Sequence, residues 1–550
     1  MATFGAAAPV LARHWQAAHD WQRAAQAWDV AAQAAHARAA TAEDVAALRA
    51  AQACLQALAS ATQEAGDHGN HGDESHQSDQ NHRRTLPFDL GLRCAQALLC
   101  SYEPDAALSQ LRALLPLPPQ DRQRARWLQL QAHVLVEQQL SEQALDSARQ
   151  ALVLADHCGD THTALLAAQR AAKALMRLDR LPEALALMPE LPPGLQQLAP
   201  KERLYWLSDR ALLLEHANLR SQSLSAYDQV IDEAEAQRRW LPAADACSNK
   251  AVALMYLGRL ADSNACAERG MALSRRAGVD GVGLLLDEMN LAGNWRDLGW
   301  FDRYLARAES LPAELRAAGM AVWAANCEHD LAVGHAWLGR VDLSQRLLAP
   351  MPDDMPEVMR AAGLITRLRL ARDFDTAQLA PRPQALIDEC QALLALGGNR
   401  GGNRGGMLRR ALAMEAAVRA PPADGAAQLA LIEADALAQQ NILAAVNACR
   451  LRVHQLLAAG AAPAAAQAAQ DLLALCASHG PPPGVYAPAL WWLASQALAA
   501  TDPAQAVRLV RQAADWIGQA APRTPVLFRS SFLQRNPVNR AVQQAAALQR

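Results

Sequence analysis

The stretch from residue 66 to residue 84, GDHGNHGDESHQSDQNHRR, holds the side chains best suited to binding a metal ion. Imidazole and carboxylate groups are ligands that Zn²⁺ or Ni²⁺ accepts; here they are His68, His71, His76 and His82, with Asp67, Asp73, Glu74 and Asp79. The stretch has no apolar residue, so it cannot bury surface to offset the entropy lost on ordering. We therefore predict a disordered His/Asp-rich insert at 66–84 and no dedicated metal site.

The run Cys327-Glu328-His329-Asp330 combines a thiol, an imidazole and carboxylates, as a cysteine hydrolase would. Adjacent residues on a helix point about 100° apart, so they cannot converge as one nucleophile and its base. The run is better explained as a partly exposed polar helix face. We predict no catalytic residue in this chain.

The glycine-rich run 397–406, GGNRGGNRGG, is the nearest match to a phosphate-binding loop. Such a loop continues into Lys and Ser or Thr after a β-strand. Here it continues into Met407-Leu408-Arg409-Arg410, without a strand before it. We interpret it as an expanded loop and predict no bound nucleotide or other cofactor.

Tryptophans are the remaining candidates for a binding surface. Trp15, Trp21 and Trp28 are close to sevenfold spacing, which favours packing of one helix pair on the next. Four others lie in the middle of the chain and could line a partner groove there: Trp295, Trp300, Trp323 and Trp337.

The charge pattern argues against nucleic acid and membranes as partners. Lys plus Arg is 52 and Asp plus Glu is 55, a net charge of −3. We interpret the local basic clusters as solvated helix ends; they are Arg122, Arg124 and Arg126, then Arg367, Arg369 and Arg372. The first residues lack the basic segment of a signal peptide, and no run of about 18 apolar residues occurs. Ten scattered cysteines without a CxxC pair indicate reduced thiols, so we expect a cytoplasmic protein.

The elements that must position these residues are helices. Hydrophobic residues make up 51% of the chain but aromatic residues only 5%, because Ala and Leu dominate. Turn-like strings that end at Leu140, Leu181, Leu219, Leu260, Phe301 and Val341 recur at intervals of 41, 38, 41, 41 and 40 residues. Gly258, Gly299 and Gly339 fit the position after a helix end, where the backbone is left-handed. Each repeat is thus helix, tight turn, helix.

A sequence repeat of this regularity predicts an all-α fold, a tetratricopeptide-like α-solenoid of roughly a dozen antiparallel helix pairs with a period near 40 residues. We expect N-terminal helical repeats at 1–65, the insert at 66–84 and a continuous solenoid at 85–520 that contains the loop 397–406. A closing segment and helix are expected at 521–550.

Both ends of the chain resemble a known family. Residues 11–18, LARHWQAA, and 21–28, WQRAAQAW, are similar to the start of the helical-repeat region of bacterial signal-transducing ATPase regulators, of the antibiotic-regulator and maltose-regulon-activator type. Residues 528–540, FRSSFLQRNPVNR, resemble the closing motif of the same group. The resemblance implies a C-terminal sensor and oligomerisation arm. This chain departs from the family because it has no Walker A sequence and no helix-turn-helix reader, so ATPase activity and DNA binding do not carry over.

The sequence therefore predicts a non-catalytic interaction module, related to this sensor arm, that binds a protein, a peptide or a small inducer on its concave face. One alternative is a stand-alone scaffold or adaptor unrelated to transcription. Another, from a different class, is a metal-dependent enzyme that uses the His-rich insert, or a hydrolase that uses the Cys327 region.

Overall fold

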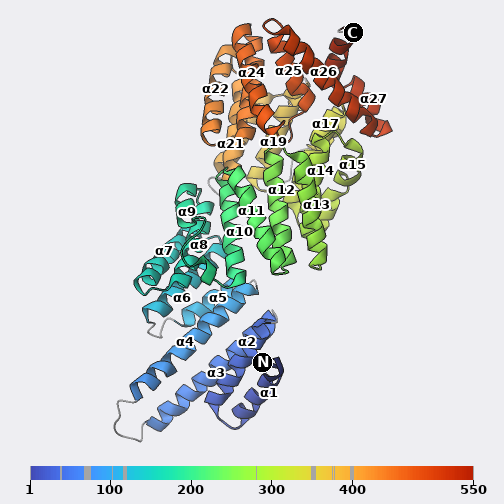
Figure 1. The fold of residues 1–550 in the computed structure, drawn as a ribbon. Helices are drawn as coiled ribbons and strands as arrows, with labels where there is room; N and C mark the ends of the chain where they lie inside the picture. Colours follow the sequence, from blue (N-terminus) through green and yellow to red (C-terminus); the bar gives the residue numbers. More distant parts are fainter. Residues whose placement is uncertain are drawn as a thin grey trace. The chain divides into compact units, whose positions relative to one another are not determined.

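The computed structural model describes the backbone of residues 2–37, 40–66, 76–101, 103–114, 120–279, 281–348, 355–374, 376, 378–396 and 402–548. These residues form an all-α helical-repeat fold, and no β-strand occurs among them (Figure 1). The chain divides into two compact units, residues 1–209 and 210–550, with the boundary inside one helix. The sequence placed no boundary there. Each unit is an α-solenoid of antiparallel helix pairs.

The helices that begin in the first unit are α1 (Ala2–Ala17), α2 (Trp21–Ala37), α3 (Thr41–Gly66), α4 (His76–Cys100), α5 (Pro104–Ala113), α6 (Asp121–Glu137), α7 (Ser141–His157), α8 (Thr161–Arg177), α9 (Leu181–Leu187), η1 (Leu195–Gln197) and α10 (Pro200–His216). Consecutive helices from α1 to α9 pack against one another, and α6 also packs on α4 and α8. Trp15, Trp21 and Trp28 pack against the apolar core of the first helices, as predicted.

The second unit continues with α11 (Arg220–Ala236), α12 (Trp240–Tyr256), α13 (Leu260–Arg276), α14 (Val282–Asp297), α15 (Phe301–Ala308), α16 (Leu311–Ala317), α17 (Ala321–Trp337), α18 (Val341–Leu347), α19 (Glu357–Asp373), α20 (Pro383–Leu396), α21 (Gly402–Arg419), α22 (Pro422–Ala438), α23 (Ile442–Ala458), α24 (Ala462–His479), α25 (Ala487–Leu498), α26 (Pro503–Ala520), η3 (Ala521–Arg523), α27 (Val526–Gln534) and α28 (Pro537–Leu548). Alternate helices α17, α19, α21, α23 and α25 also pack on one another, so they form an inner layer.

The turns between helices explain the repeat. A residue with φ between 58° and 74° follows the ends of α6, α8, α10, α12, α14 and α17; these residues are Gln139, Asp179, Asn218, Gly258, Gly299 and Gly339, at intervals of 39 to 41 residues. At each, two backbone hydrogen bonds close the helix end; at Gly258 they run from Gly258 N to Met255 O and from Arg259 N to Leu254 O. This left-handed cap is the Schellman arrangement. Where the residue is not glycine, the chain bears a modest backbone penalty.

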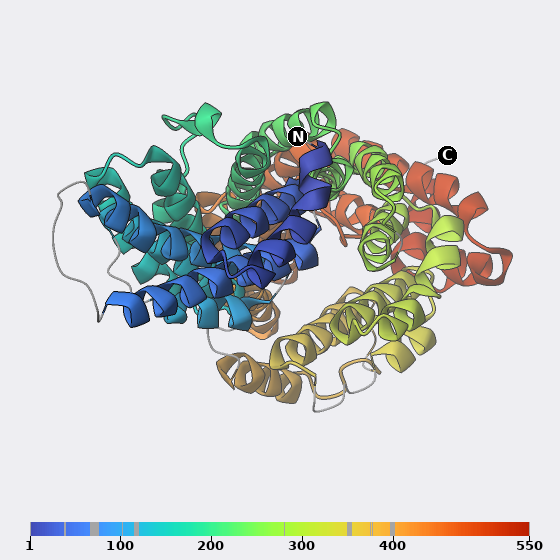
Figure 2. The ribbon, with the colours of Figure 1, turned by 90° about the horizontal axis from the view of Figure 1, so that it is seen from below.

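In the second unit the C-terminal segment packs on turns far back in the sequence. Ser531 Oγ donates to Leu338 O at 2.7 Å, and Asn536 Nδ2 donates to Trp337 O at 2.8 Å. Phe301, at the start of α15, packs on Trp516 of α26. Figure 1 shows α26 and α27 beside α15 and α17, and Figure 2 shows the same helices from below. The array in this unit is therefore closed by its own last helices.

The closing contacts use the terminal motif quoted above. Phe528, Ser531, Phe532, Asn536 and Asn539 are all buried. The two asparagines donate hydrogen bonds to backbone carbonyl oxygens near helix ends, where the next turn of helix is missing. Asn536 bonds Trp337 O, and Asn539 Nδ2 donates to Phe532 O at 2.8 Å. The motif thus fastens the end of the chain to α17.

Two predicted loops overlap helices in the structure. Residues 67–75 of the insert lie outside the described residues, whereas the backbone of residues 76–84 belongs to α4. Likewise residues 397–401 of the glycine-rich run lie outside the described residues, and α21 begins at Gly402. The disorder of the insert stays a prediction for 67–75. Among the described residues, no helix has the length and apolar character needed to cross a membrane.

Candidate binding sites

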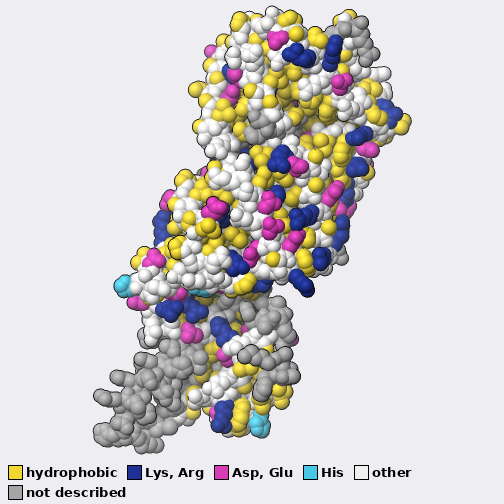
Figure 3. Space-filling view, viewed as in Figure 1, with side chains coloured by type: hydrophobic (Ala, Val, Ile, Leu, Met, Phe, Trp, Pro, Cys, Tyr) yellow, Lys and Arg dark blue, Asp and Glu magenta, His cyan; other side chains and the backbone are white. Residues whose placement is uncertain are grey.

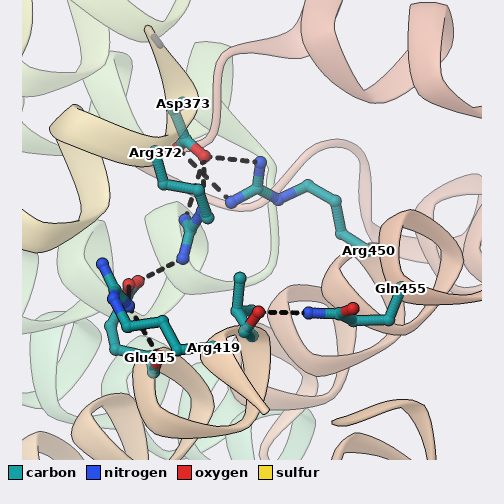
Figure 4. A network of polar contacts seen from close by, with 7 residues as sticks. Arg372, Asp373, Glu415, Arg419, Arg450 and Gln455 are labelled. Carbon is teal, nitrogen blue, oxygen red and sulfur yellow. Dashed lines mark hydrogen bonds and ion pairs between the residues drawn. The ribbon is translucent and has the colours of Figure 1, made fainter. Parts of the chain in front are cut away.

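A network of buried ion pairs connects the inner helices α19, α21 and α23 of the second unit (Figure 4). Arg372 bonds Asp373 at 2.9 Å and Glu415 on α21, and Arg419 bonds the other oxygen of Glu415 at 2.8 Å. Arg450 on α23 reaches both oxygens of Asp373, at 3.2 and 3.4 Å. Asp373 is therefore shared between two guanidinium groups from different repeats.

Asp373 owes its charge to these neighbours. Burial alone would raise the pKa of a carboxyl group, but Arg372, Arg450 and Arg369 outweigh it and hold the pKa of Asp373 well below its usual range. The side chains of Arg372 and Arg450 are only 12% and 11% exposed. The ion pairs therefore act in a largely desolvated place, where an unpaired charge is costly.

A second Arg-Asp pair stands at the equivalent end of α14. Arg296 bonds Asp297 at 2.8 Å and also bonds Asp330 on α17, and its guanidinium lies 5.0 Å from the centre of the Trp337 ring. The free oxygen of Asp297 accepts a hydrogen bond from Gly484 N at 2.9 Å. Both Arg-Asp pairs therefore fix later parts of the chain to helix ends, those of α14 and α19.

A narrow cavity lies beside these pairs, between α17, α19, α23 and the start of α25. Its polar lining is Arg369, Asp373, Asn447 and Arg450, and its aromatic lining includes Trp337 and Tyr486. The space open to a water-sized group is about 20 Å³, enough for about one water molecule. A whole cofactor does not fit in it.

The first unit has a wider, open groove across the starts of α6 and α8. Its volume is about 480 Å³, and it is lined by polar side chains from three successive repeats: Asp89, Gln120, Arg122, Gln123, Arg126, Asp160 and His162. Arg122 pairs with Asp160 at 3.2 Å, and Arg126 approaches Asp89 at 4.0 Å. The groove thus contains groups of both charges.

Hydrogen bonds set the charges of this groove. The hydrogen bond to Glu202, at 2.9 Å, raises the pKa of His162 above its ordinary value. Burial opposes ionisation of Asp160, yet hydrogen bonds from Thr163 and Arg122 hold its pKa below the usual range. Asp160 also caps α8 by accepting from Thr163 N. The groove therefore keeps a fixed acidic group beside exposed basic ones.

The structure places the four mid-chain tryptophans in different surroundings. Trp337 is buried, with its ring 4.9 Å from that of Tyr486, and it lines the narrow cavity. Trp300 has Arg303 and Arg523 over its ring at 5.1 and 5.0 Å. Trp295 is partly buried against the core, and Trp323 is 38% exposed. A common groove for all four therefore remains a prediction.

The interpretation of the second basic cluster as solvated helix ends is wrong. Arg372 is buried in the ion-pair network, Arg369 lines the cavity, and Arg367 donates to Leu379 O at 3.0 Å. The signal that sequence reasoning missed is the dipeptide Arg-Asp, which recurs at 296–297 and 372–373 at the ends of α14 and α19. A charged pair at a repeated helix end points inward in both cases.

The run from Cys327 to Asp330 does not assemble a nucleophile and its base. Glu328 pairs with Arg316, and Asp330 pairs with Arg296. Burial, helped by the charges of Asp330 and Glu328, raises the pKa of the Cys327 thiol to about 12. At neutral pH this thiol stays protonated, which is the opposite of what a catalytic cysteine needs.

Alkylation tests this arrangement. With iodoacetamide on the folded protein at pH 8, we expect exposed Cys158 to be modified and Cys327 to remain free, because Cys327 is buried and its raised pKa keeps the thiol protonated. Peptide mass spectrometry after quenching measures both sites, and denaturant should expose Cys327. Equal modification of the two sites in the folded protein would contradict the structure and restore the cysteine-hydrolase alternative.

The described residues contain no group of three or more His, Cys, Asp or Glu side chains that could hold a metal ion. The side chains of the His-rich insert lie outside the described ones. Over the face seen in Figure 3, basic and acidic side chains are interspersed.

Comparison with known proteins gives fold similarity only. No protein-family model matches the chain, and no curated protein matches it. Among solved structures, a signal-transduction ATPase with a tetratricopeptide-repeat sensor from Pyrococcus horikoshii is 11% identical over 61% of this chain, with a TM-score of 0.36. The match spans only 53% of that ATPase.

The matches to two further solved structures span more of the length of those chains. A Rap protein, solved in complex with competence and sporulation factor, is 12% identical over 78% of this chain and 99% of its own, with a TM-score of 0.30. A chain from the structure of the APC/C hetero-tetramer Cut9–Hcn1 is 11% identical over 98% of this chain and 95% of its own length, with a TM-score of 0.43. Similarities this distant say nothing of what this chain binds.

Proposed function

We propose that this chain is a non-catalytic interaction module that binds a protein or peptide segment in the polar groove of its first unit. The observation that carries the proposal is the groove itself: an open channel of about 480 Å³ whose charged side chains come from three successive repeats. An extended peptide is the ligand that contacts several repeats at once.

The charges of the groove favour a ligand of mixed charge. The ion pair Arg126–Asp89 is exposed on both sides, at 49% and 43%, and in the pair Arg122–Asp160 the arginine is 69% exposed while the carboxylate is buried and also bonded by Thr163. Exposed pairs contribute little to stability, so a ligand can replace them at small cost. Acidic ligand groups would pair with the arginines, and a basic group would pair with Asp89.

A peptide selection on the full chain tests the proposal, followed by affinity measurement by fluorescence anisotropy. We expect enriched peptides to bind Arg126→Glu at least about tenfold more weakly, because a groove cation becomes an anion. The matched control is Arg149→Glu, which changes an arginine of the same unit that is 50% exposed and outside the groove. The proposal is wrong if no peptide is enriched, or if both variants bind equally well.

We further propose that the module serves as the sensor and oligomerisation arm of an ATPase-type regulator. The terminal motifs support this, since residues 528–540 both resemble the family's closing motif and close the second unit here. The module would then respond to a small inducer or a protein partner from the cytoplasm. An ATPase domain and a DNA-binding domain should be encoded upstream of Met1 in the same frame, and translating that DNA checks it.

A stand-alone scaffold is the second candidate. It would share the groove but not the upstream domains, so an unrelated gene at that position would favour it. The two hypotheses also predict different oligomeric behaviour, because a sensor arm should change its oligomeric state when its ligand binds. Light scattering with and without the selected peptide measures this.

A further inference from the structure

In the second unit, the charge of Arg369 has no paired carboxylate among the described residues. Arg369 on α19 is partly buried and lines the narrow cavity, yet it makes no hydrogen bond or ion pair with any described residue. By contrast, Arg296, Arg372, Arg419 and Arg450 each pair with a carboxylate. Guanidinium groups do not lose their proton in proteins, so Arg369 remains charged.

The surroundings of Arg369 are unfavourable for a lone cation. The removal of water lowers its pKa, and although Asp373 attracts it, Arg296, Arg372 and Arg450 repel it. Asp373 itself is already bonded by Arg372 and Arg450. Arg369 and the four paired arginines together have four carboxylate partners, Asp297, Asp330, Asp373 and Glu415, so positive charge exceeds negative charge by one within this group.

The cavity offers donors for an incoming anion. Arg450 lines the same space, and its buried Nε has no hydrogen-bond partner in the described part of the chain. The open space, about 20 Å³, admits one oxygen atom with its immediate contacts, and its walls include the aromatic rings of Trp337 and Tyr486. A water molecule could accept a hydrogen bond there but could not balance the charge.

We propose that this cavity binds an oxyanion, a carboxylate or phosphate group that projects an oxygen between Arg369 and Arg450. Planar guanidinium groups hold both kinds of oxyanion through charge-assisted hydrogen bonds. The group can belong to a small ion or to the end of a larger ligand whose remainder stays outside. This site lies in the second unit and does not depend on the groove proposed above.

Thermal unfolding of the full chain tests the site, with sodium phosphate compared with sodium chloride at equal ionic strength. We expect phosphate to raise the Tm of the wild type, increasingly with concentration, because a ligand of the folded state stabilises it. Phosphate also stabilises proteins by exclusion from their surface. The specific response is therefore the part of the shift that Arg369→Met loses.

The variant carries a second prediction that a purely structural arginine would not satisfy. Without phosphate, Arg369→Met should unfold at the same temperature as the wild type or about 1–2 °C higher, because it removes a repelled charge and leaves no carboxylate unpaired. The control Arg346→Gln removes an exposed arginine of α18 in the same unit and should keep the full phosphate response.

Two ligand series distinguish the source of the oxyanion. Acetate replaces phosphate in one, and a peptide with a free C-terminal carboxylate is compared with its amide in the other. A rise in Tm with any of these anions that is absent in Arg369→Met supports the site. The anion that gives the largest such rise identifies the source of the oxyanion. An equal response in wild type and Arg369→Met, no response to any anion, or a variant that unfolds several degrees lower without anion overturns the proposal.

Discussion

Gly339→Ala is expected to destabilise the second unit by about 3–4 kcal/mol. Gly339 has φ 72°, and a Cβ there would lie 2.4 Å from Ser531 O, a backbone atom that cannot move away alone. The left-handed backbone costs a side chain about 1–2 kcal/mol. Displacing α27 would also weaken the hydrogen bonds of Ser531 and Asn536 to Leu338 O and Trp337 O, at about 1 kcal/mol each.

Gly319→Ala is the matched control. Gly319 has φ 76°, nearly the same backbone, but a Cβ there would meet nothing within 4 Å. Gly319→Ala should therefore lower the free energy of unfolding only by the cost of the left-handed backbone, about 1–2 kcal/mol. Unfolding in guanidinium chloride, followed by circular dichroism, measures the free energy of unfolding of both variants. Limited proteolysis should cleave within residues 526–548 in Gly339→Ala alone. Equal costs for the two variants would show that the C-terminal segment is not held at Gly339.

Asp373→Asn should destabilise the protein by about 3 kcal/mol, the second large effect. The change keeps the shape of the side chain but leaves Arg372 and Arg450 sharing an uncharged group in a poorly hydrated place. Breaking a buried pair by removing one partner typically costs 3–5 kcal/mol. We take the low end because the Asp373 side chain is 25% exposed. Asp388 is an exposed carboxylate on α20 whose one bond within the described part of the chain comes from Gln384, so Asp388→Asn should cost about 0.5 kcal/mol or less.

The pH dependence of the Asp373 contribution has a definite sign. Its folded-state pKa is lowered, so its contribution is fully present above the unfolded value of about 3.9 and is lost as pH falls below it. The difference in stability between wild type and Asp373→Asn should therefore shrink steadily from about pH 4 to about pH 2 without vanishing there, because the folded-state pKa lies lower still, as urea unfolding at each pH would show. A constant difference over that range would mean that the charge of Asp373 is not the cause.

The repeat itself could be predicted from the sequence because its turns have a strict backbone requirement. Gly258, Gly299 and Gly339 marked left-handed helix ends, and Gln139, Asp179 and Asn218 adopt the same conformation at the same interval. Periodicity therefore located turns even where the residue was not glycine. The helix type followed from composition, since Ala and Leu lose little on entering a helix.

The candidate sites could not be predicted in the same way. Periodicity reports contacts between neighbouring repeats, whereas Asp297 meets Gly484, and Trp337 meets Asn536, across 187 and 199 residues of sequence. Arg369 and Arg372 looked like solvated helix ends, because sequence alone does not say which later segment covers them. The groove at Arg122 and Arg126 was missed for a related reason, as its lining comes from three repeats.

The fastening of the last helices to α17 changes how the second unit should come apart. In an open array, each repeat is held by its two neighbours alone, and the terminal repeats fray first. Here Ser531 and Asn536 bond the end of α17, which lies 193 and 199 residues earlier in the sequence, so unfolding of α27 must also expose the end of α17. A ligand that loosens or tightens the packing of α27 would therefore also change the stability of repeats that are distant from it in sequence.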